Sequence, residues 1–505
     1  MWSSIAKPNA RRTRPATLSC FVATAHLKLS DKTVISENTQ RTKYVLGDLL
    51  SSSVAWFCFN CMRYSLDLIH SGFTSLGAFL SSPIVITGQL VFPLLMMAVY
   101  YLSGYYNDVF HKSRVQEFFT TLWSTGIITL LIYFLALIND ATPRRRFNYE
   151  MIAVLWGTLF VFTYLVRCIF TSYTSRMIKS RRWSFNTLII GRGAAGVAFG
   201  NKLDTMPRSL GYKIVGYVSI PGENDVKDMS LPCYTLDQIK EACSENNVKE
   251  LIVVPTRQMP EAVLDTVNQL FELNLPIKIT PDRLNMTLSN ARISDMVGDP
   301  LVDISSSSMS EGSKNIKRLL GIIISFLVLV LLSPLLLAVA IAIKIDSPGP
   351  VFYNQERIGL HNIPFFIHKF RSMRQDAENG SGPQLTTDDD PRVTRVGRFL
   401  RKYRIDELPQ FWNVIKGDMA IVGPRPERQY YIEQITKRAP SYALLHQVRP
   451  GITSLGMVKY GYAQNVDQMI ERLRYDLLYL ENMTLLNDFK IMVYTIKTIV
   501  TGKGM

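Results

Sequence analysis

The apolar run LLGIIISFLVLVLLSPLLLAVAIAIKI, residues 319–345, is the longest in the chain and decides how the parts around it are arranged. As a helix it is long enough to cross a bilayer, which takes about 20 residues. Pro334 interrupts the run, and a proline inside a helix removes one backbone donor and kinks the axis. The hydroxyl of Ser333 can satisfy a backbone carbonyl that the kink frees. The run therefore predicts a helix that is broken near its middle.

Basic residues flank this run at both ends and favour a helix that returns to the side it entered from. They are Lys314, Lys317 and Arg318 before the run and Lys344 near its end. Positive charge collects on the cytoplasmic side of a membrane, so both ends are expected there. A straight crossing, the alternative, would separate residues 346–505 from the domain before the run. We therefore predict a re-entrant helix over 319–345 that bends at Ser333 and Pro334.

Four further apolar segments predict a transmembrane bundle over residues 41–183. They cover 45–64, 84–105, 118–138 and 151–171. Asp48, near the start of the first segment, makes that segment the weakest of the four. Basic loops before the first, between the second and third and after the fourth indicate that both ends of the bundle face the cytoplasm. The arginines at 144–146 contradict this rule, and we accept that one exception.

Two segments without apolar periodicity border the predicted domains. Residues 1–40 are basic and irregular, which predicts a mobile leader. Residues 303–314, DISSSSMSEGSK, are polar and rich in serine, which predicts a linker. The remaining 315–505 form a mainly helical C-terminal domain that includes the re-entrant helix.

Residues 184–302 predict a Rossmann-like α/β domain. Short apolar strands alternate with helical stretches, which implies a parallel sheet. Gly191, Gly193 and Gly196 follow the first strand and open a helix, as in a dinucleotide-binding loop. Ser219 and Ile220 end the second strand, where a ribose-binding acid is expected. An NAD(P) site is therefore disfavoured, and a degenerate domain for regulation, packing or dimer formation is preferred.

The composition adds that the partner is anionic. The net charge is +15, which suits nucleic acid, anionic lipid or a phosphorylated substrate. The six cysteines form no regular framework. A structural zinc site is therefore disfavoured, because it usually takes four ligands.

Asp406 and Glu407 stand side by side at the end of a basic stripe. The stripe consists of Arg392, Arg395, Arg398, Arg401, Lys402 and Arg404. A nearby arginine lowers the pKa of a carboxylate, so we predict that both acids are ionised at neutral pH. Such acids can bind a hard divalent cation or attack phosphorus. A solvated charged face at a membrane surface is the alternative for the first arginines.

Four separated blocks resemble a known family. They are SPGPVFYNQERIG (347–359), HKFRSM (368–373), RVGRFLRKYRIDELPQFWNVIKGDMAIVGPRPE (395–427) and VRPGITSLGMV (448–458). Together they resemble the bacterial polyprenyl-phosphate sugar-phosphate transferases, which are monotopic phosphoglycosyl transferases, over about 314–505. The whole chain resembles their long subfamily, which initiates exopolysaccharide, capsule or O-antigen synthesis. The stretch RPGITSLGMVKYGY departs from the Trp-Ala-Gln segment of many relatives.

The resemblance implies a two-step reaction. Asp406 would attack the β-phosphate of a UDP-sugar and release UMP, and undecaprenyl phosphate would then take the sugar phosphate from the aspartyl intermediate. Glu407 would bind Mg²⁺, with Asp418 as a further acid on the metal side. The remaining site residues that it implies are Lys369, Arg371, Arg404 and Arg425 for phosphate, Glu427 beside them, and Arg449 for the nucleotide.

The same resemblance implies the partners and the location. The partners would be polyprenyl phosphate, a UDP-sugar and the lipid bilayer, without nucleic acid, and a homodimer stays open. The chain would be a multi-pass protein of the bacterial inner membrane with its soluble domains in the cytoplasm. Two other functions stay open: a membrane-anchored NAD(P)-dependent sugar-nucleotide oxidoreductase or epimerase, and a non-catalytic scaffold for glycan assembly.

Overall fold

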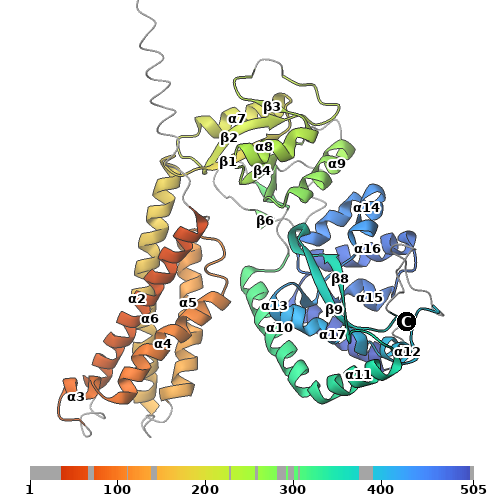
Figure 1. Cartoon of the computed structure of the whole chain (residues 1–505). Coiled ribbons are helices and arrows are strands. Elements are labelled where there is room, and N and C mark those ends of the chain that lie inside the picture. Colours follow the sequence, from red (N-terminus) through yellow and green to blue (C-terminus); the bar gives the residue numbers. More distant parts are fainter. Residues whose placement is uncertain are drawn as a thin grey trace, which may run out of the picture.

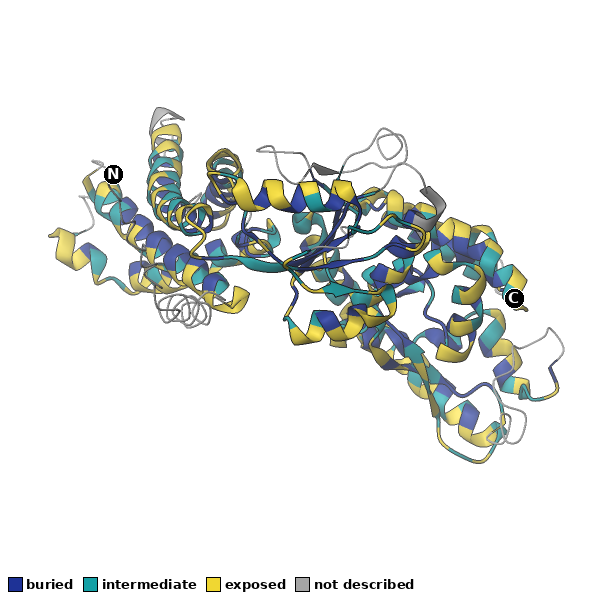
Figure 2. Ribbon diagram, turned by 90° about the horizontal axis from the view of Figure 1, so that it is seen from above, coloured by how far each residue is buried: buried dark blue, intermediate teal, exposed yellow. Residues whose placement is uncertain are grey.

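The chain consists of a helical bundle, an α/β layer and a C-terminal part, in that order (Figure 1). The computed structural model describes residues 36–65, 73–110, 112–137, 145–226, 229–255, 260–280, 292–293, 301–304, 308–374 and 390–500. Most of the predicted leader therefore lies outside the described residues. Figure 2 shows that buried residues follow the faces along which helices and strands meet.

Among the described residues, the bundle contains four helices that are long and apolar enough to cross a membrane. They are α2 (Glu37–Ser65), α4 (Pro83–Leu102), α5 (Arg114–Ile132), continued by the π-helix η2 (Tyr133–Leu137), and α6 (Arg145–Lys179), with the short α3 (Leu76–Leu80) before α4. The four predicted segments fall on these helices. Both α2 and α6 continue well beyond the predicted segments, because polar residues at their ends also take helical backbone.

Asp48, which weakens the first segment in the sequence, is paired inside the bundle. Its carboxylate accepts hydrogen bonds from Arg167 Nε at 2.9 Å and Nη2 at 2.7 Å, and from the Tyr106 hydroxyl at 2.8 Å. Asp48 and Arg167 are both buried, at 1% and 0% exposure. A charge among apolar helices is costly unless it is paired. The pair therefore lets α2 carry an acid and still pack inside the bundle.

The α/β layer is built on a parallel sheet, as the sequence predicts. Its order is β3-β2-β1-β4-β5-β7-β6, with antiparallel pairing only at β7 and β6. The strands are β1 (Phe185–Ile190), β2 (Tyr212–Val218), β3 (Cys233–Tyr234), β4 (Glu250–Val253), β5 (Ile277–Ile279), β6 (Arg292–Ile293) and β7 (Val302–Asp303). The helices are α7 (Ala194–Thr205), η4 (Leu236–Gln238), α8 (Ile239–Glu245), α9 (Pro260–Leu270) and η5 (Phe271–Leu273).

The glycine loop lies between β1 and α7. Gly191 has a φ of 124°, and a Cβ on Gly196 would lie 2.0 Å from the Gly191 carbonyl oxygen, so both positions require glycine. Glu223 covers the loop, since a Cβ on Gly193 would lie 2.4 Å from its Oε1 and its Oε2 accepts a hydrogen bond from Arg192 N at 2.9 Å. The side chain of Glu223 therefore occupies one backbone N–H donor of this loop.

The C-terminal part begins with two helices that meet at the predicted break. Helices α10 (Glu311–Leu331) and α11 (Ser333–Asp346) are bent by 62°. Ser333 Oγ donates a hydrogen bond to the Val330 carbonyl at 2.8 Å. Val330 lies four residues before Pro334, so this is the carbonyl that the missing proline N–H would have bonded. The kink that Ser333 and Pro334 predict is present. Helix α10 begins inside the predicted linker 303–314.

Short strands and helices complete this part around the bent pair. They are β8 (Phe352–Ile358), η7 (Leu360–Asn362), β9 (Pro364–Phe370), α12 (Arg395–Lys402), η8 (Ile405–Glu407), α13 (Gln410–Lys416), β10 (Ala420–Val422), α14 (Gln429–Arg438), η9 (Pro440–Gln447), β11 (Gly451–Thr453), α15 (Leu455–Lys459), α16 (Val466–Glu481) and α17 (Leu485–Val500). The described residues of the C-terminal part are therefore mainly helical, with one antiparallel hairpin, β8–β9, and one parallel pair, β10–β11.

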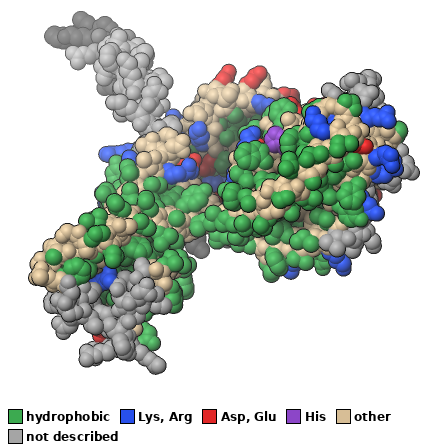
Figure 3. All heavy atoms as spheres, turned by 60° about the horizontal axis from the view of Figure 1, so that its bottom comes forward, with side chains coloured by type: hydrophobic (Ala, Val, Ile, Leu, Met, Phe, Trp, Pro, Cys, Tyr) green, Lys and Arg blue, Asp and Glu red, His purple; other side chains and the backbone are tan. Residues whose placement is uncertain are grey.

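The bent pair exposes a broad apolar face. The exposed apolar side chains on α10 and α11 are Ile316, Leu319, Leu320, Ile323, Phe326, Leu327, Val330, Leu331, Leu335, Leu337, Ile341 and Ile345. Figure 3 shows hydrophobic side chains over much of the face turned toward the viewer. A contiguous apolar surface of this kind marks contact with a membrane or another protein.

Candidate active site

The backbone after α12 turns sharply and brings both acids inward. The Thr394 hydroxyl caps α12 by accepting a hydrogen bond from Gly397 N at 3.0 Å. Arg404 then adopts a left-handed conformation with a φ of 53°. This residue redirects the chain into the single turn η8, which carries Asp406 and Glu407. Their exposures are only 8% and 6%, so the two acids lie below the surface.

Glu407 is surrounded by three cations, defined here as the cation ring. Its Oε1 lies 3.2 Å from Lys369 Nζ and 3.5 Å from Arg425 Nη2, and its Oε2 lies 3.7 Å from Arg404 Nη1. Burial acts to raise the pKa of Glu407, but Lys369, Arg425 and Arg404 outweigh burial and lower the pKa below its ordinary value. Glu407 is therefore ionised at neutral pH, and its single charge is shared among three cations.

Asp406 is different, because no described residue forms a hydrogen bond or an ion pair with its carboxylate. Burial and the adjacent charge of Glu407 raise the pKa of Asp406, and Lys369, Arg401 and Arg404 compensate only in part. The prediction that nearby arginines lower the pKa of both acids is therefore wrong for Asp406. The cations can be read from the sequence, but the burial of Asp406 cannot, and burial has the larger effect on its pKa. An acid without partners is available to a ligand.

Tyr462 contacts Arg404 and Arg425 of the cation ring. It is not among the site residues predicted from the sequence. Its hydroxyl accepts a hydrogen bond from Arg404 Nη1 at 2.8 Å and donates one to Glu407 Oε1 at 3.4 Å. Its ring also contacts the guanidinium groups of Arg404 and Arg425, at 4.6 and 4.9 Å. Tyr462 is followed by Ala463 and Gln464. The departure from Trp-Ala-Gln thus comes down to tyrosine in place of tryptophan.

Glu427 forms a second buried cluster behind Arg425. It accepts a hydrogen bond from Arg357 Nη1 at 3.0 Å and from Arg472 Nη2 at 2.7 Å. Burial acts to raise the pKa of Glu427, but Arg472, Arg357 and Arg425 lower it overall. Arg357 stands on β8 and Arg472 on α16, so Glu427 ties the Gly-Pro-Arg-Pro turn to both. Arg357 lies in the first family block, whereas Arg472 lies outside all four blocks.

We expect Glu427→Gln to destabilise the C-terminal part. The change leaves Arg357 and Arg472 buried without a counter-charge, and breaking a buried ion pair costs about 3–5 kcal/mol. Denaturant unfolding of the detergent-solubilised protein measures the loss. Glu433→Gln, at an exposed acid on α14, is the matched control and should leave the unfolding midpoint unchanged. Equal midpoints for the two variants would contradict a supporting role for Glu427.

Three predicted site residues bond neither to the cation ring nor to the Glu427 cluster. Arg371 donates hydrogen bonds to the carbonyls of Ser347 and Pro348, at 2.7 and 2.9 Å, and so holds the turn after α11. Asp418, beyond the far end of α13, pairs with Lys416 at 3.3 Å. Arg449 donates from Nε to the Gly417 carbonyl at 3.0 Å. No interaction among the described residues joins any of the three to Asp406 or Glu407.

The acids fit a magnesium ion only together with a substrate. No group of three or more His, Cys, Asp or Glu side chains among the described residues is arranged to hold a metal. Magnesium, however, usually takes only one or two carboxylates from the protein, and substrate phosphates and water complete its coordination. Asp406 and Glu407 can supply that number, whereas Asp418 lies apart from them.

Comparison with known proteins adds the family. Residues 312–502 match the model of the bacterial sugar transferase family. The UDP-glucose:undecaprenyl-phosphate glucose-1-phosphate transferase of Klebsiella pneumoniae is 30% identical over 420 residues, which cover 80% of this chain and 87% of that protein. The enzyme with the same name from Escherichia coli K12 is 33% identical over 289 residues, covering 57% and 62% of the two chains.

A shorter match has a higher identity. The UDP-N-acetylgalactosamine-undecaprenyl-phosphate N-acetylgalactosaminephosphotransferase of Aeromonas hydrophila is 47% identical over 189 residues, which cover 37% of this chain and 44% of that protein. The identity is thus higher over this shorter segment than over the match to the Klebsiella protein, which extends over most of the chain. The chain belongs to the bacterial sugar transferases and is a polyprenyl-phosphate phosphoglycosyl transferase.

Proposed function

We propose that this chain transfers a sugar 1-phosphate from a UDP-sugar to undecaprenyl phosphate, through a covalent intermediate on Asp406. The observation that carries the proposal is the contrast between two adjacent acids: Asp406 has no partner among the described residues, while Glu407 is held by the cation ring. The names of the similar proteins support the two substrates. The transfer would be the first step in building a surface polysaccharide such as an exopolysaccharide, capsule or O-antigen.

The first step forms one bond and breaks one. An Asp406 carboxylate oxygen attacks the β-phosphorus of the UDP-sugar, and the bond from that phosphorus to the oxygen bridging the two phosphates breaks. UMP leaves with the bond's electron pair, and the sugar phosphate remains on Asp406. In the second step a phosphate oxygen of undecaprenyl phosphate attacks the same phosphorus and restores the Asp406 carboxylate. The product is undecaprenyl diphosphate carrying the sugar.

The cation ring supplies the charge that both steps need. Phosphoryl transfer depends mainly on positioning and on neutralising the phosphate oxygens. Lys369, Arg404 and Arg425 outnumber Glu407, so the ring retains positive charge for a diphosphate. Arg425 stands between Pro424 and Pro426 and offers a preorganised fork of donors. Mg²⁺ held by Glu407 would neutralise further negative charge on the diphosphate.

We expect the acid limb of the pH profile to depend on Arg401. Asp406 must be ionised to attack, and its raised pKa means that it takes up a proton at a higher pH than an ordinary aspartate. Arg401 lowers that pKa, so Arg401→Gln should move the acid limb of kcat/KM to still higher pH. Arg398→Gln, at an exposed position one turn earlier in α12, should leave the limb in place. Identical profiles for both variants would show that Arg401 does not set the pKa of the group that titrates in the acid limb.

We also propose that α2, α4, α5 and α6 cross the bacterial inner membrane and that α10 and α11 form a re-entrant pair. The 62° bend, the Ser333 hydrogen bond and the exposed apolar face support this placement. The α/β layer, in this view a degenerate Rossmann-like domain, and the C-terminal part would then both face the cytoplasm.

Cysteine labelling tests the re-entrant placement. In a cysteine-free background, Ser310→Cys and Lys344→Cys flank the bent pair. We expect an impermeant maleimide to label both positions in inverted vesicles and neither in right-side-out vesicles. Labelling of the two cysteines from opposite sides would show a crossing helix instead.

The overall function is tested with the full-length protein in lipid nanodiscs. UDP-glucose and UDP-N-acetylgalactosamine are supplied separately with undecaprenyl phosphate and Mg²⁺, and both UMP and the lipid product are measured. We expect one UMP for each sugar-linked lipid, and loss of both products in EDTA. Turnover of NAD(P) without UMP release would support the oxidoreductase alternative. Absence of both NAD(P) turnover and UMP release would support the scaffold alternative.

A further inference from the structure

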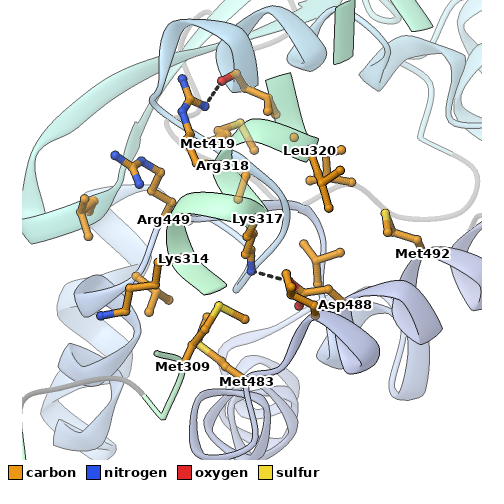
Figure 4. Close-up of a pocket in the computed structure, with 18 of the residues that line it drawn as sticks. Met309, Lys314, Lys317, Arg318, Leu320, Met419, Arg449, Met483, Asp488 and Met492 are labelled. Carbon is orange, nitrogen blue, oxygen red and sulfur yellow. Dashed lines mark hydrogen bonds and ion pairs between the residues drawn. The ribbon is translucent and has the colours of Figure 1, made fainter. Parts of the chain in front are cut away.

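A cavity of about 530 Å³ lies beside α10 and is distinct from the cation ring. Most of its lining is apolar and comes from α10, β10 and α17; Leu320, Ile324, Ile421, Phe489 and Met492 are examples. Neither Asp406, Glu407 nor any member of the cation ring lines it. Figure 4 shows Arg318, Arg449 and Lys314 along one side of this cavity and Leu320 and Met492 on the other. The cavity is therefore amphipathic, with a basic side and an apolar side.

Two guanidinium groups stand together on the basic side. Arg318 donates hydrogen bonds to the carbonyls of Val414 and Ile415, the latter at 2.8 Å. Arg449 donates from Nε to the Gly417 carbonyl at 3.0 Å. Both arginines thus cap the end of α13, and this structural role accounts for the guanidinium N–H groups that bond to the carbonyls. The two Nη groups of Arg449 have no partner among the described residues, and they remain for a ligand.

The acids near this cavity are already neutralised. Asp488 is the only acid in its lining, and it pairs with Lys317 at 2.9 Å and accepts a hydrogen bond from the Tyr479 hydroxyl at 2.6 Å. Lys314 pairs with Glu311 at 2.6 Å. No acid among the described residues forms an ion pair with Arg318 or Arg449. Asp418, whose charge also acts on Arg318, pairs with Lys416 at 3.3 Å. The basic side therefore carries two positive charges that have no ion-pair partner among the described residues, which favours an anion.

We propose that this cavity binds one anionic glycerophospholipid of the bilayer, with its phosphate on Arg318 and Arg449 and an acyl chain along Leu320, Ile324 and Met492. The sequence of α10 supports this orientation, because its cations end at Arg318 and its apolar run begins at the next residue. In the re-entrant placement proposed above, Arg318 lies at headgroup level and the apolar side faces the hydrocarbon. Basic pockets at the cytoplasmic ends of membrane helices bind lipid headgroups in this way.

Native mass spectrometry of the full-length protein in a neutral detergent tests the proposal. The protein is mixed with equal amounts of phosphatidylglycerol and phosphatidylcholine that carry the same acyl chains. We expect one retained phosphatidylglycerol, with a preference of about tenfold or more over phosphatidylcholine. Arg449→Gln should remove the preference, and Met492→Trp, which fills the apolar side, should reduce retention of both lipids. Lys437→Gln, at an exposed lysine outside the cavity, should behave as the wild type.

Four outcomes would overturn the proposal. Equal retention of the two lipids, or wild-type retention in both cavity variants, would show that the cavity does not select an anionic phospholipid. If undecaprenyl phosphate displaces phosphatidylglycerol at equal concentration and Arg449→Gln raises its KM, the cavity serves the acceptor. If Arg449→Gln raises only the KM for the UDP-sugar and leaves lipid retention unchanged, Arg449 seats the nucleotide. If the protein retains the lipid but has no transfer activity, the proposed function is refuted and the lipid proposal is not.

Discussion

Asp406→Asn should abolish sugar-phosphate transfer while leaving the fold intact. The change removes the attacking carboxylate and preserves the size of the side chain, and loss of a nucleophile costs on the order of 10³-fold or more in turnover. Because no described residue forms a hydrogen bond or an ion pair with Asp406, the variant breaks no pair. We expect its unfolding midpoint to equal or exceed that of the wild type.

A single-turnover experiment separates loss of the nucleophile from slower binding. Without undecaprenyl phosphate, the wild type should release about one UMP per protein molecule and retain a phosphosugar adduct on the peptide that contains Asp406. Asp406→Asn should release none. Asp467→Asn, at an acid that is 71% exposed, makes the same chemical change away from the site and should retain the burst. Transfer by Asp406→Asn within tenfold of the wild-type rate would exclude the covalent mechanism.

Glu407→Gln should lower both activity and stability, unlike the change at its neighbour. The substitution leaves Lys369, Arg404 and Arg425 close together without their shared counter-charge. Removing one partner of a buried ion pair costs about 3–5 kcal/mol. Repulsion would also spread the three cations that hold the diphosphate, and we expect turnover to fall by about 10²-fold, the usual size for loss of one preorganised charge contact.

A double variant distinguishes these two effects. Glu407→Gln with Lys369→Met removes the nearest cation together with the acid, and replacing a buried pair with uncharged groups is often close to neutral for stability. Denaturant unfolding should therefore show recovery in the double variant, while steady-state kinetics should show no recovery of turnover. A single variant as stable as the wild type, or a double variant less stable than the single one, would contradict the proposed role of the cation ring.

The elements that depend on local pattern could be predicted from the sequence. The four apolar helices, the parallel strands and the bend at Ser333 and Pro334 all follow from runs of neighbouring residues. Four of the six residues of the basic stripe lie on α12, and Arg395 and Arg398 are exposed, as the solvated-face alternative held. Arg392 precedes the helix and pairs with Asp390, and Arg404 follows the helix.

The site could be predicted only in part, because side-chain direction and burial are tertiary properties. Lys369 lies on β9 and reaches Glu407, and strand alternation would send Arg371 to the same side. The strand, however, ends at Phe370, so Arg371 turns away to the carbonyls after α11. Tyr462 is 55 residues from Glu407 in the chain, and only the folded structure brings them together.

The pair of Asp48 and Arg167 has a consequence for how the protein is made. Arg167 follows Asp48 by 119 residues. At a synthesis rate of about 5–20 residues per second, the ribosome reaches the arginine about 6–24 s after the aspartate. If α2 enters the bilayer as proposed, Asp48 has no Arg167 to pair with during that time. Among the described helices α2 emerges first, yet its pairing is completed last, and assembly of the bundle is complete only when α6 arrives.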